Sequence, residues 1–276
     1  MPAYMPFVCP RSIARVPALI AGLLLCLPSS LCQADSPDPL LVREAAQSEK
    51  REDAANRPVV LATTHHGEWV AKRRWASVAD QAGLDWRLSS EPITSESLNA
   101  IDVLCILMPK KWFSSSECEA VEEFIKAGSA LLLVLDEEER TPLEVTAVNK
   151  MLSPFGIELL ADTPYLHNRG AVAPAGPINA ERRELPYSGS RTVRGGTPFS
   201  FALDEQGDPT DIAHGVYAQH ASGGRIIVLG EGMASLFLGS QTGKRLTGTV
   251  PADTDYWGAD SEAFNRDLLS WLAGQR

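Results

Sequence analysis

Residues 102–140 read DVLCILMPKKWFSSSECEAVEEFIKAGSALLLVLDEEER, and this stretch decides the fold. It contains most of one apolar run, residues 101–108, and the whole of a second, residues 129–135. Both runs are apolar at nearly every position, which predicts strands that are buried on both faces. Such strands are typical of the centre of a parallel sheet.

The segment between these two strands has the signals of a helix. Ser114 can form a capping box with Glu117 at its start. Ser116 with Glu119 is the alternative pair. Gly128 can end the helix. A strand, a helix and a second strand in succession indicate a right-handed crossover between parallel strands.

Apolar periodicity outside this stretch repeats the alternation of strands and helices. A tight turn at Gly223 and Gly224 predicts a hairpin that feeds the last strand into the sheet. Residues 161–209 are rich in Pro, Gly, Arg and Asn and predict an irregular insertion or edge region, in which only short patches such as residues 199–203 could be strands. The fold class that follows is α/β, with a three-layer, doubly wound, mostly parallel sheet. The further expected strands are residues 58–64, 84–88, 157–160, 215–220 and 225–229, and the further expected helices are residues 67–83, 141–155 and 260–272.

The first 34 residues have the order of a secretory signal. Arg11 and Arg15 precede the apolar run 16–27, and Cys32-Gln33-Ala34 offers small side chains for cleavage after Ala34. The run is shorter than the roughly 20 residues that span a bilayer, so a retained anchor is the weaker alternative. We expect a periplasmic or secreted protein with no stable membrane span after cleavage.

Changes in composition along the chain predict the domain organisation. Residues 1–34 are expected to be the signal peptide. Residues 35–57 are polar without a sustained apolar period and predict a flexible linker. Residues 58–276 form the folded domain.

Composition excludes several classes of protein. The chain has 276 residues, of which 44% are hydrophobic and 22% charged, as in ordinary soluble globular proteins. Its net charge of −10 argues against a nucleic-acid partner. After signal cleavage only Cys105 and Cys118 remain. We expect two buried thiols, with a disulfide between them as the alternative.

The carboxyl ends of parallel strands meet at one edge of a sheet, where ligands of such folds bind. Lys110-Lys111-Trp112 could hold an anionic or sugar ligand with Trp112 as a stacking face. Alternatively, this segment is an exposed turn in which Trp112 and Phe113 seal the helix start. The ligand-binding candidates at this edge are His65, His66, Glu68, Lys110, Trp112, Glu137 and Glu231.

Histidine and carboxylate side chains at this edge could also ligate a divalent cation. The other interpretation is a capped helix start with a solvated acidic rim. No HxxxH or CxxC spacing supports a metal, so we expect no resident metal or cofactor. A metal-assisted hydrolase that uses His65, His66, Glu68 and Glu231 stays open as the alternative.

Covalent catalysis is not expected. A nucleophile elbow needs Ser or Cys between small residues after a strand. The turn at residues 136–139 is Asp-Glu-Glu-Glu, and the turn Gly230-Glu231-Gly232 has a glutamate between its glycines. Cys105 lies within a predicted strand and Cys118 on a predicted helix.

Residues 102–140, together with VNKMLSPFGIELLADT (148–163), GRIIVLGEGMASLF (224–237) and DSEAFNRDLLSWLAG (260–274), carry a family resemblance. The chain resembles the GIFT-type branch of the class I glutamine-amidotransferase-like superfamily over roughly residues 58–160 and 212–273. That branch includes the N-terminal domain of an intraflagellar-transport protein, auxiliary domains of gliding-motility transporters and many bacterial proteins of unknown function.

The resemblance implies a flavodoxin-like fold that has lost the Cys-His-Glu triad of the amidotransferases. The turn after Leu135, where active members of the superfamily place the cysteine, begins here with Asp136-Glu137. Related bacterial sequences often have Gly-Asp after the late strand, and this chain has Gly230-Glu231 instead.

Together these features predict an exported, non-catalytic ligand- or partner-binding domain of the cell envelope. A carbohydrate or an envelope protein is the expected partner. A structural subunit of an envelope complex is a further alternative.

Overall fold

The computed structural model describes residues 57–164, 170–185, 190–204, 206–232 and 259–275. The predicted signal peptide and all of the predicted linker except Arg57 lie outside these residues.

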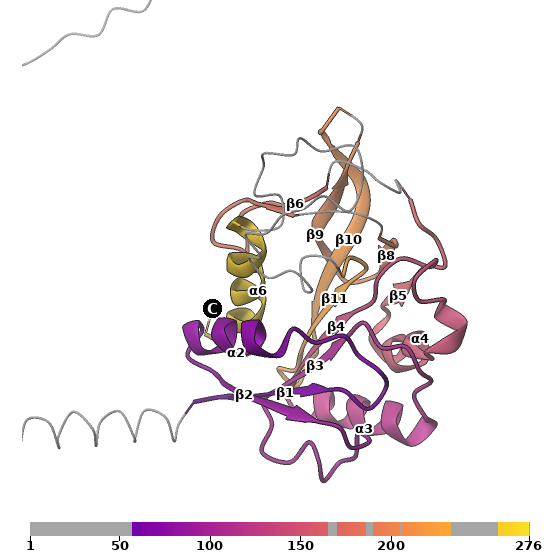
Figure 1. Cartoon of the computed structure of the whole chain (residues 1–276), viewed down its shortest axis with the longest axis vertical. Coiled ribbons are helices and arrows are strands. Elements are labelled where there is room, and N and C mark those ends of the chain that lie inside the picture. Colours follow the sequence, from indigo (N-terminus) through magenta and orange to yellow (C-terminus); the bar gives the residue numbers. More distant parts are fainter. Residues whose placement is uncertain (1–56, 165–169, 186–189, 205, 233–258, 276) are drawn as a thin grey trace, which may run out of the picture. The chain divides into compact units, whose positions relative to one another are not determined.

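The centre of the fold is a five-stranded parallel sheet with the strand order of flavodoxin-like proteins (Figure 1). Each strand pairs in parallel with its neighbour, so all five carboxyl ends lie at the same edge. The predicted fold class is therefore confirmed. In spatial order the strands are β2 (Asp85–Ser89), β1 (Val59–Thr63), β3 (Val103–Leu107), β4 (Ala130–Val134) and β11 (Arg225–Leu229).

Antiparallel strands extend the sheet beyond β11. The predicted hairpin is confirmed: β10 pairs with β11 from Gly215 opposite Leu229 to Gln219 opposite Arg225. The predicted insertion or edge region contributes three more strands to the same sheet and one strand of a short separate pair, so it is part of the fold. The added strands are β10 (Pro209–Gln219), β9 (Thr197–Leu203), β6 (Ala171–Ala173) and β7 (Arg183–Leu185); the separate pair is β5 (Glu158–Leu159) with β8 (Val193–Arg194).

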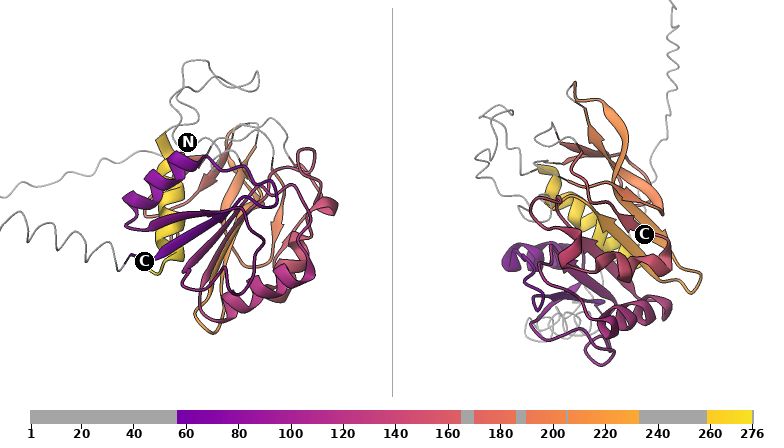
Figure 2. Two further views of the ribbon diagram at one scale, coloured as in Figure 1. Left: turned by 60° about the horizontal axis from the view of Figure 1, so that its bottom comes forward. Right: turned by 90° about the vertical axis from the view of Figure 1, so that its right-hand side faces the viewer.

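Helices cover both faces of the parallel sheet (Figure 2). On one face, α2 (Lys72–Gln81) and α6 (Ala259–Leu272) pack through Trp75 and Phe264. On the other, α3 (Ser115–Lys126) and α4 (Val148–Leu152) pack through apolar side chains such as those of Val121 and Met151. Neighbouring residues of β3 and β4 alternate between these two cores, which explains why both runs are apolar throughout.

The capping prediction is confirmed for one of the two pairs. The Ser114 side chain accepts a hydrogen bond from the backbone N–H of Glu117, and the Glu117 side chain accepts one from the backbone N–H of Ser114. The chain then turns after α3 at Gly128, whose φ of 102° lies in the left-handed region.

Two helix predictions were wrong in extent. The segment 141–155 is a 3₁₀ turn (Leu143–Val145), then α4, then a second 3₁₀ turn (Ser153–Phe155), because Ala147 takes a left-handed φ of 63° and interrupts the helix. The helix within 67–83 begins only at Lys72, so Trp69 precedes it and is exposed.

Cys105 and Cys118 are free thiols, which excludes the alternative of a disulfide in this structure. Cys105 packs in the core under α2 and α6, and Cys118 packs in the core on the other face of the sheet. Burial raises the pKa of both thiols. Both cysteines therefore act as small apolar residues.

Among the described helices, none combines the length and the apolar character needed to cross a membrane.

Candidate functional site

The site lies on the loops that leave the carboxyl ends of the parallel strands, residues 64–71, 108–114, 135–142 and 230–232, which we call the rim. Backbone hydrogen bonds tie these loops together. The N–H of Lys110 donates to the carbonyl of His66 at 2.8 Å, and the N–H of Trp69 donates to the carbonyl of Leu107 at 3.0 Å. The parallel topology thus places the four loops at one edge of the sheet, and these bonds join the first two of them.

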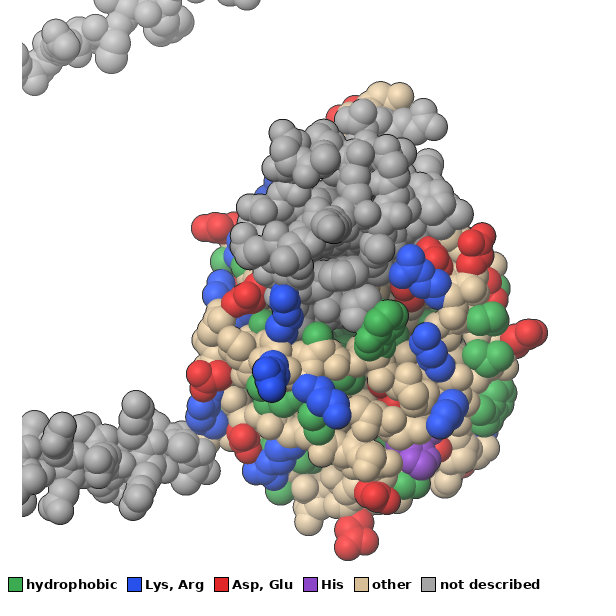
Figure 3. Space-filling view, viewed as in Figure 1, with side chains coloured by type: hydrophobic (Ala, Val, Ile, Leu, Met, Phe, Trp, Pro, Cys, Tyr) green, Lys and Arg blue, Asp and Glu red, His purple; other side chains and the backbone are tan. Residues whose placement is uncertain are grey.

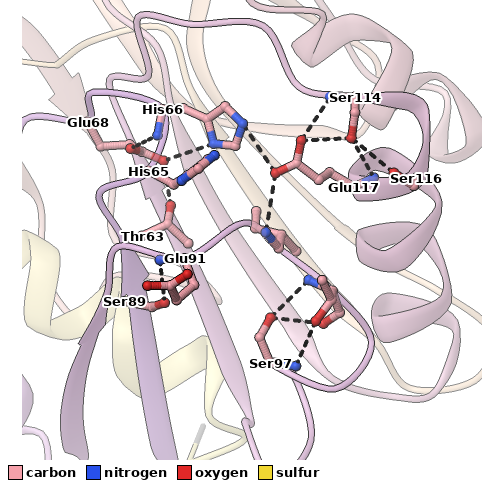
Figure 4. Close-up of polar contacts among 12 residues, drawn as sticks. Thr63, His65, His66, Glu68, Ser89, Glu91, Ser97, Ser114, Ser116 and Glu117 are labelled. Carbon is pink, nitrogen blue, oxygen red and sulfur yellow. Dashed lines mark hydrogen bonds and ion pairs between the residues drawn. The ribbon is translucent and has the colours of Figure 1, made fainter.

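A polar cluster forms around His66 at one part of the rim (Figure 4). The buried ring of His66 stacks on Phe113, with ring centroids 3.9 Å apart. Its Nε2 lies 3.2 Å from Oε1 of Glu117, and its Nδ1 lies 3.7 Å from Oε1 of Glu68. His65 lies against the same ring, with a centroid separation of 4.9 Å. The sequence placed His65, His66 and Glu68 here, and the structure adds Glu117.

Both glutamates of this cluster are ionised. Burial raises the pKa of Glu68, but the neighbouring His66 and the hydrogen bond from the hydroxyl of Thr63 outweigh it, so the net pKa is lowered. Burial likewise raises the pKa of Glu117, and hydrogen bonds from Ser114 and Ile93 bring it below its ordinary value. Two carboxylates thus flank the two ring nitrogens of His66.

A second group of acids lies after β4. Burial raises the pKa of Asp136 although Arg140 opposes it, and burial and the neighbouring Asp136 raise the pKa of Glu137. Arg140 contacts both, with nitrogen-to-oxygen distances of 3.2 Å to Asp136 and 2.7 Å to Glu137. One oxygen of each carboxyl, Oδ1 of Asp136 and Oε2 of Glu137, is buried without a hydrogen-bond partner. Glu137 thus lies at the rim, as predicted, but as a buried group.

Arg191, from the insertion, fixes this acidic loop in place. Its side chain is fully buried and donates to three backbone carbonyls, those of Asp136, Thr141 and Leu160, and to the carboxylate of Glu138. No sequence pattern indicates this role, because nothing in an irregular polar segment distinguishes one arginine from the others.

Glu231 is buried in the turn after β11. The carbonyl of Gly230, beside it, accepts from the N–H of Arg191 at 2.9 Å. Gly232 packs against Met108 and Asp136, and a Cβ there would come within 2.5 Å of the sulfur of Met108. Glu231 therefore lies on the β4 side of the rim. The one group of three potential metal ligands found among the described residues contains His65, His66 and Glu117, and includes neither Asp136 nor Glu231.

A small cavity lies beside the acidic group, between three loops of the rim. It has a volume of about 130 Å³ and is lined by residues that include Trp69, Met108, Lys110 and Asp136. Lys110 Nζ lies over the ring of Trp69, 5.5 Å from its centroid. Trp112, on the same loop as Lys110, is 60% exposed, whereas Phe113 is fully buried. Phe113 alone therefore seals the start of the helix.

Met108 occupies the strained turn of the rim. Its φ of 54° makes it the one non-glycine residue with a left-handed backbone at the end of a described parallel strand. This is the kind of backbone turn that presents a nucleophile in an elbow. Here it presents a thioether to the cavity, followed by Pro109.

Comparison with known proteins agrees with the fold. Residues 59–174 match the family model of the IFT52 GIFT domain. This match runs from β1 to the end of β6 and includes the histidine cluster, Met108 and the acidic loop after β4.

The relatives with a GIFT domain are distant. The human intraflagellar transport protein 52 homolog is 25% identical over 120 residues, which cover 40% of this chain and 26% of that protein. The chain thus spans about a quarter of the length of the curated relative. The solved mmIFT52 N-terminal domain is 18% identical, covers 63% of this chain and 86% of its own, and superposes with a TM-score of 0.50, which supports the fold. PurLQS from Thermotoga maritima is 10% identical, covers 78% of this chain and 99% of its own, and has a TM-score of 0.42.

Proposed function

We propose that the chain is a non-catalytic binding domain of a protein assembly and that the rim is its binding surface. The observation that carries this proposal is the pair of exposed tryptophans on neighbouring rim loops, Trp69 and Trp112. They are 54% and 60% exposed. Large exposed aromatic side chains cost solvation free energy in an isolated domain, and tryptophan is enriched at the energetic centres of interfaces.

Basic residues are close to both tryptophans in the sequence, and Lys110 lies over the ring of Trp69. Lys72, Lys110 and Lys111 are exposed, and neither residues 69–75 nor 108–116 contain an acid. On the face drawn in Figure 3, Lys and Arg side chains lie among exposed hydrophobic ones, and most Asp and Glu side chains lie toward its edge. This local basic character in a chain of net charge −10 favours a partner that presents an acidic segment.

The size of the cavity favours a protein over a small molecule. Ligand pockets usually measure about 300–1,000 Å³, and this cavity of about 130 Å³ has room for a single aliphatic side chain. We therefore expect the partner to insert one apolar side chain between Trp69 and Met108 and to place its acids on the surrounding lysines.

The chemistry of the rim supports a non-catalytic role. The strained strand-end position holds Met108, and the two described cysteines are buried with raised pKa values. The match to the IFT52 GIFT domain points the same way, because the matched relative is named as a transport protein.

A carbohydrate of the cell envelope is the second candidate ligand. The exposed ring of Trp112 favours it, because a flat aromatic face can stack on a sugar ring. This candidate goes with the export that the first 34 residues predict.

The test is fluorescence polarisation with a labelled peptide of aspartates and glutamates around one central leucine, which we call the acidic probe peptide. Trp69→Ala and Trp112→Ala should each weaken its binding by about tenfold or more, as expected for truncated interface tryptophans. Leu88→Ala, which removes a 40% exposed apolar side chain on β2, is the matched control and should change nothing.

Unlabelled cellohexaose and chitohexaose, added as competitors, separate the two candidates. Competition by either sugar, lost in Trp112→Ala, would assign the site to carbohydrate. Absence of binding by the acidic probe peptide to the unaltered protein would contradict the proposal.

A further inference from the structure

We propose that His65, His66 and Glu117 bind a divalent transition-metal ion, with zinc the best fit to these ligands. Each residue offers one ligand atom, and these atoms all lie within 4.8 Å of one another. Two imidazoles and one carboxylate are a ligand set that zinc commonly takes in sites that keep a fourth position open. This inference is independent of the proposed binding of an acidic partner.

The separation of His66 and Glu117 suits a shared metal ion. Nε2 of His66 and Oε1 of Glu117 are 3.2 Å apart. Zinc bonds of about 2.1 Å to both atoms would meet at an angle of about 100°, close to tetrahedral. The ion would thus fit between the two atoms with little movement of either.

His65 is held with its free nitrogen available. Its Nδ1 lies 3.0 Å from the carbonyl oxygen of Ser90. A carbonyl can only accept a hydrogen bond, so Nδ1 carries the proton and Nε2 keeps its lone pair. A backbone carbonyl that fixes the tautomer in this way is the usual outer contact of a metal-binding histidine.

His66 has a buried nitrogen that a metal would explain. Its Nδ1 lacks a hydrogen-bond partner, although the side chain is buried and Oε1 of Glu68 is 3.7 Å away. In a neutral His66 that donates from Nε2 to Glu117, the unprotonated Nδ1 would face the carboxylate of Glu68. A metal on Nε2 moves the ring proton to Nδ1, which then faces Glu68 with the correct polarity.

Both carboxylates are already positioned for these roles. Glu68 accepts from the hydroxyl of Thr63 at 2.5 Å and from the backbone N–H of His66 at 2.7 Å. Glu117 accepts from the N–H and hydroxyl of Ser114 through Oε2 and from the N–H of Ile93 through Oε1. Glu68 would therefore orient His66, and Glu117 would bind the ion without needing to be ordered first.

The competing account is a doubly protonated His66 that forms ion pairs with Glu68 and Glu117 and needs no metal. The two accounts differ in what His65 does. His65 is exposed and makes no contribution to the ion pairs, but it supplies one of the three metal ligands.

The experiment titrates tag-free, chelator-treated protein with Co²⁺ and follows the visible absorption of the bound ion, then displaces it with Zn²⁺. We expect one equivalent to bind. His65→Ala and Glu117→Gln should each lower the affinity by at least about tenfold, and Glu68→Gln should lower it by about 10- to 100-fold as an orienting residue. Glu119→Gln, an exposed acid on the same helix, is the matched control and should bind as the unaltered protein does.

Circular dichroism of each variant shows whether it is folded, and the exposed position of His65 makes His65→Ala the safest of them. Equal Co²⁺ spectra and affinities for the unaltered protein and folded His65→Ala would overturn the proposal. So would failure of the unaltered protein to bind Co²⁺ while NMR shows both ring nitrogens of His66 protonated.

Discussion

Replacement of Arg191 by methionine tests how the insertion holds the rim. The guanidinium makes four hydrogen bonds from a fully buried position, at 2.6 Å to the carbonyl of Asp136, 2.7 Å to that of Thr141, 3.1 Å to that of Leu160 and 2.8 Å to Oε2 of Glu138. Arg191→Met removes all four hydrogen bonds. The carbonyls of Asp136, Thr141 and Leu160 then lose the guanidinium N–H groups that donate to them.

The expected loss is about 4 kcal/mol in the free energy of unfolding. Breaking a buried charged network from one side costs about 3–5 kcal/mol, because the remaining groups stay desolvated. Most of this loss should come from the carbonyls, because the Glu138 side chain is 29% exposed and can be solvated by water. Glu138→Gln should therefore cost only about 1 kcal/mol or less.

Urea unfolding followed by tryptophan fluorescence and circular dichroism measures these changes. With a slope of about 2 kcal/mol per molar urea, Arg191→Met should lower the midpoint by about 2 M. Arg194→Met, at an exposed position on β8, is the matched control and should change the free energy of unfolding by less than about 0.5 kcal/mol. A loss below about 1 kcal/mol in Arg191→Met would refute the reasoning that this side chain anchors the acidic loop.

Three further predictions concern the acidic loop, the thiols and the leader. Burial raises the pKa of Asp136 in the folded state. At pH values between the ordinary pKa and this raised pKa, the folded state therefore binds more protons than the unfolded state. The stability that this group contributes is lost as the pH rises through the folded pKa. The free energy of unfolding of Asp136→Asn minus that of the unaltered protein should thus increase as the pH rises above about 4, the ordinary pKa of Asp, and a flat difference would contradict this assignment. Cys105 and Cys118 should react with Ellman's reagent only after unfolding, and rapid labelling of the folded protein would show that they are accessible. Mass spectrometry of the exported protein should find Asp35 at its amino terminus; recovery of only the uncleaved chain would contradict cleavage after Ala34.

The sequence predicted the parallel centre of the fold because its signal is local and strong. The runs that contain Cys105 and Leu132 are apolar at nearly every position for a direct physical reason, since neighbouring residues face two different cores. The capping box of Ser114 and Glu117 is likewise a local pattern, and the structure contains it.

Features that depend on distant contacts could not be predicted. The strands of the insertion are short and add to the sheet edge formed by β10, so their pairing is set by tertiary structure. The break at Ala147 has no glycine or proline at the position itself to mark it. Arg191 contacts residues between 31 and 55 positions away.

The candidate site was predicted in part. Parallel topology placed His65, His66 and Lys110 on one rim, as expected from the strand ends. Glu117 was identified only as a helix cap, because its second contact, with His66, bridges residues 51 positions apart that meet only in the fold. One side chain thus serves both the helix and the cluster.

The most direct test of the rim as a binding surface is charge reversal at Lys110, which lies over Trp69 at the cavity. At low salt, Lys110→Glu should weaken binding of the acidic probe peptide by about tenfold and strengthen binding of a peptide in which lysines replace its acids. Lys126→Glu makes the same charge change at the far end of α3 and should leave both affinities unaltered. Equal effects of the two substitutions, or no effect of either, would contradict the account.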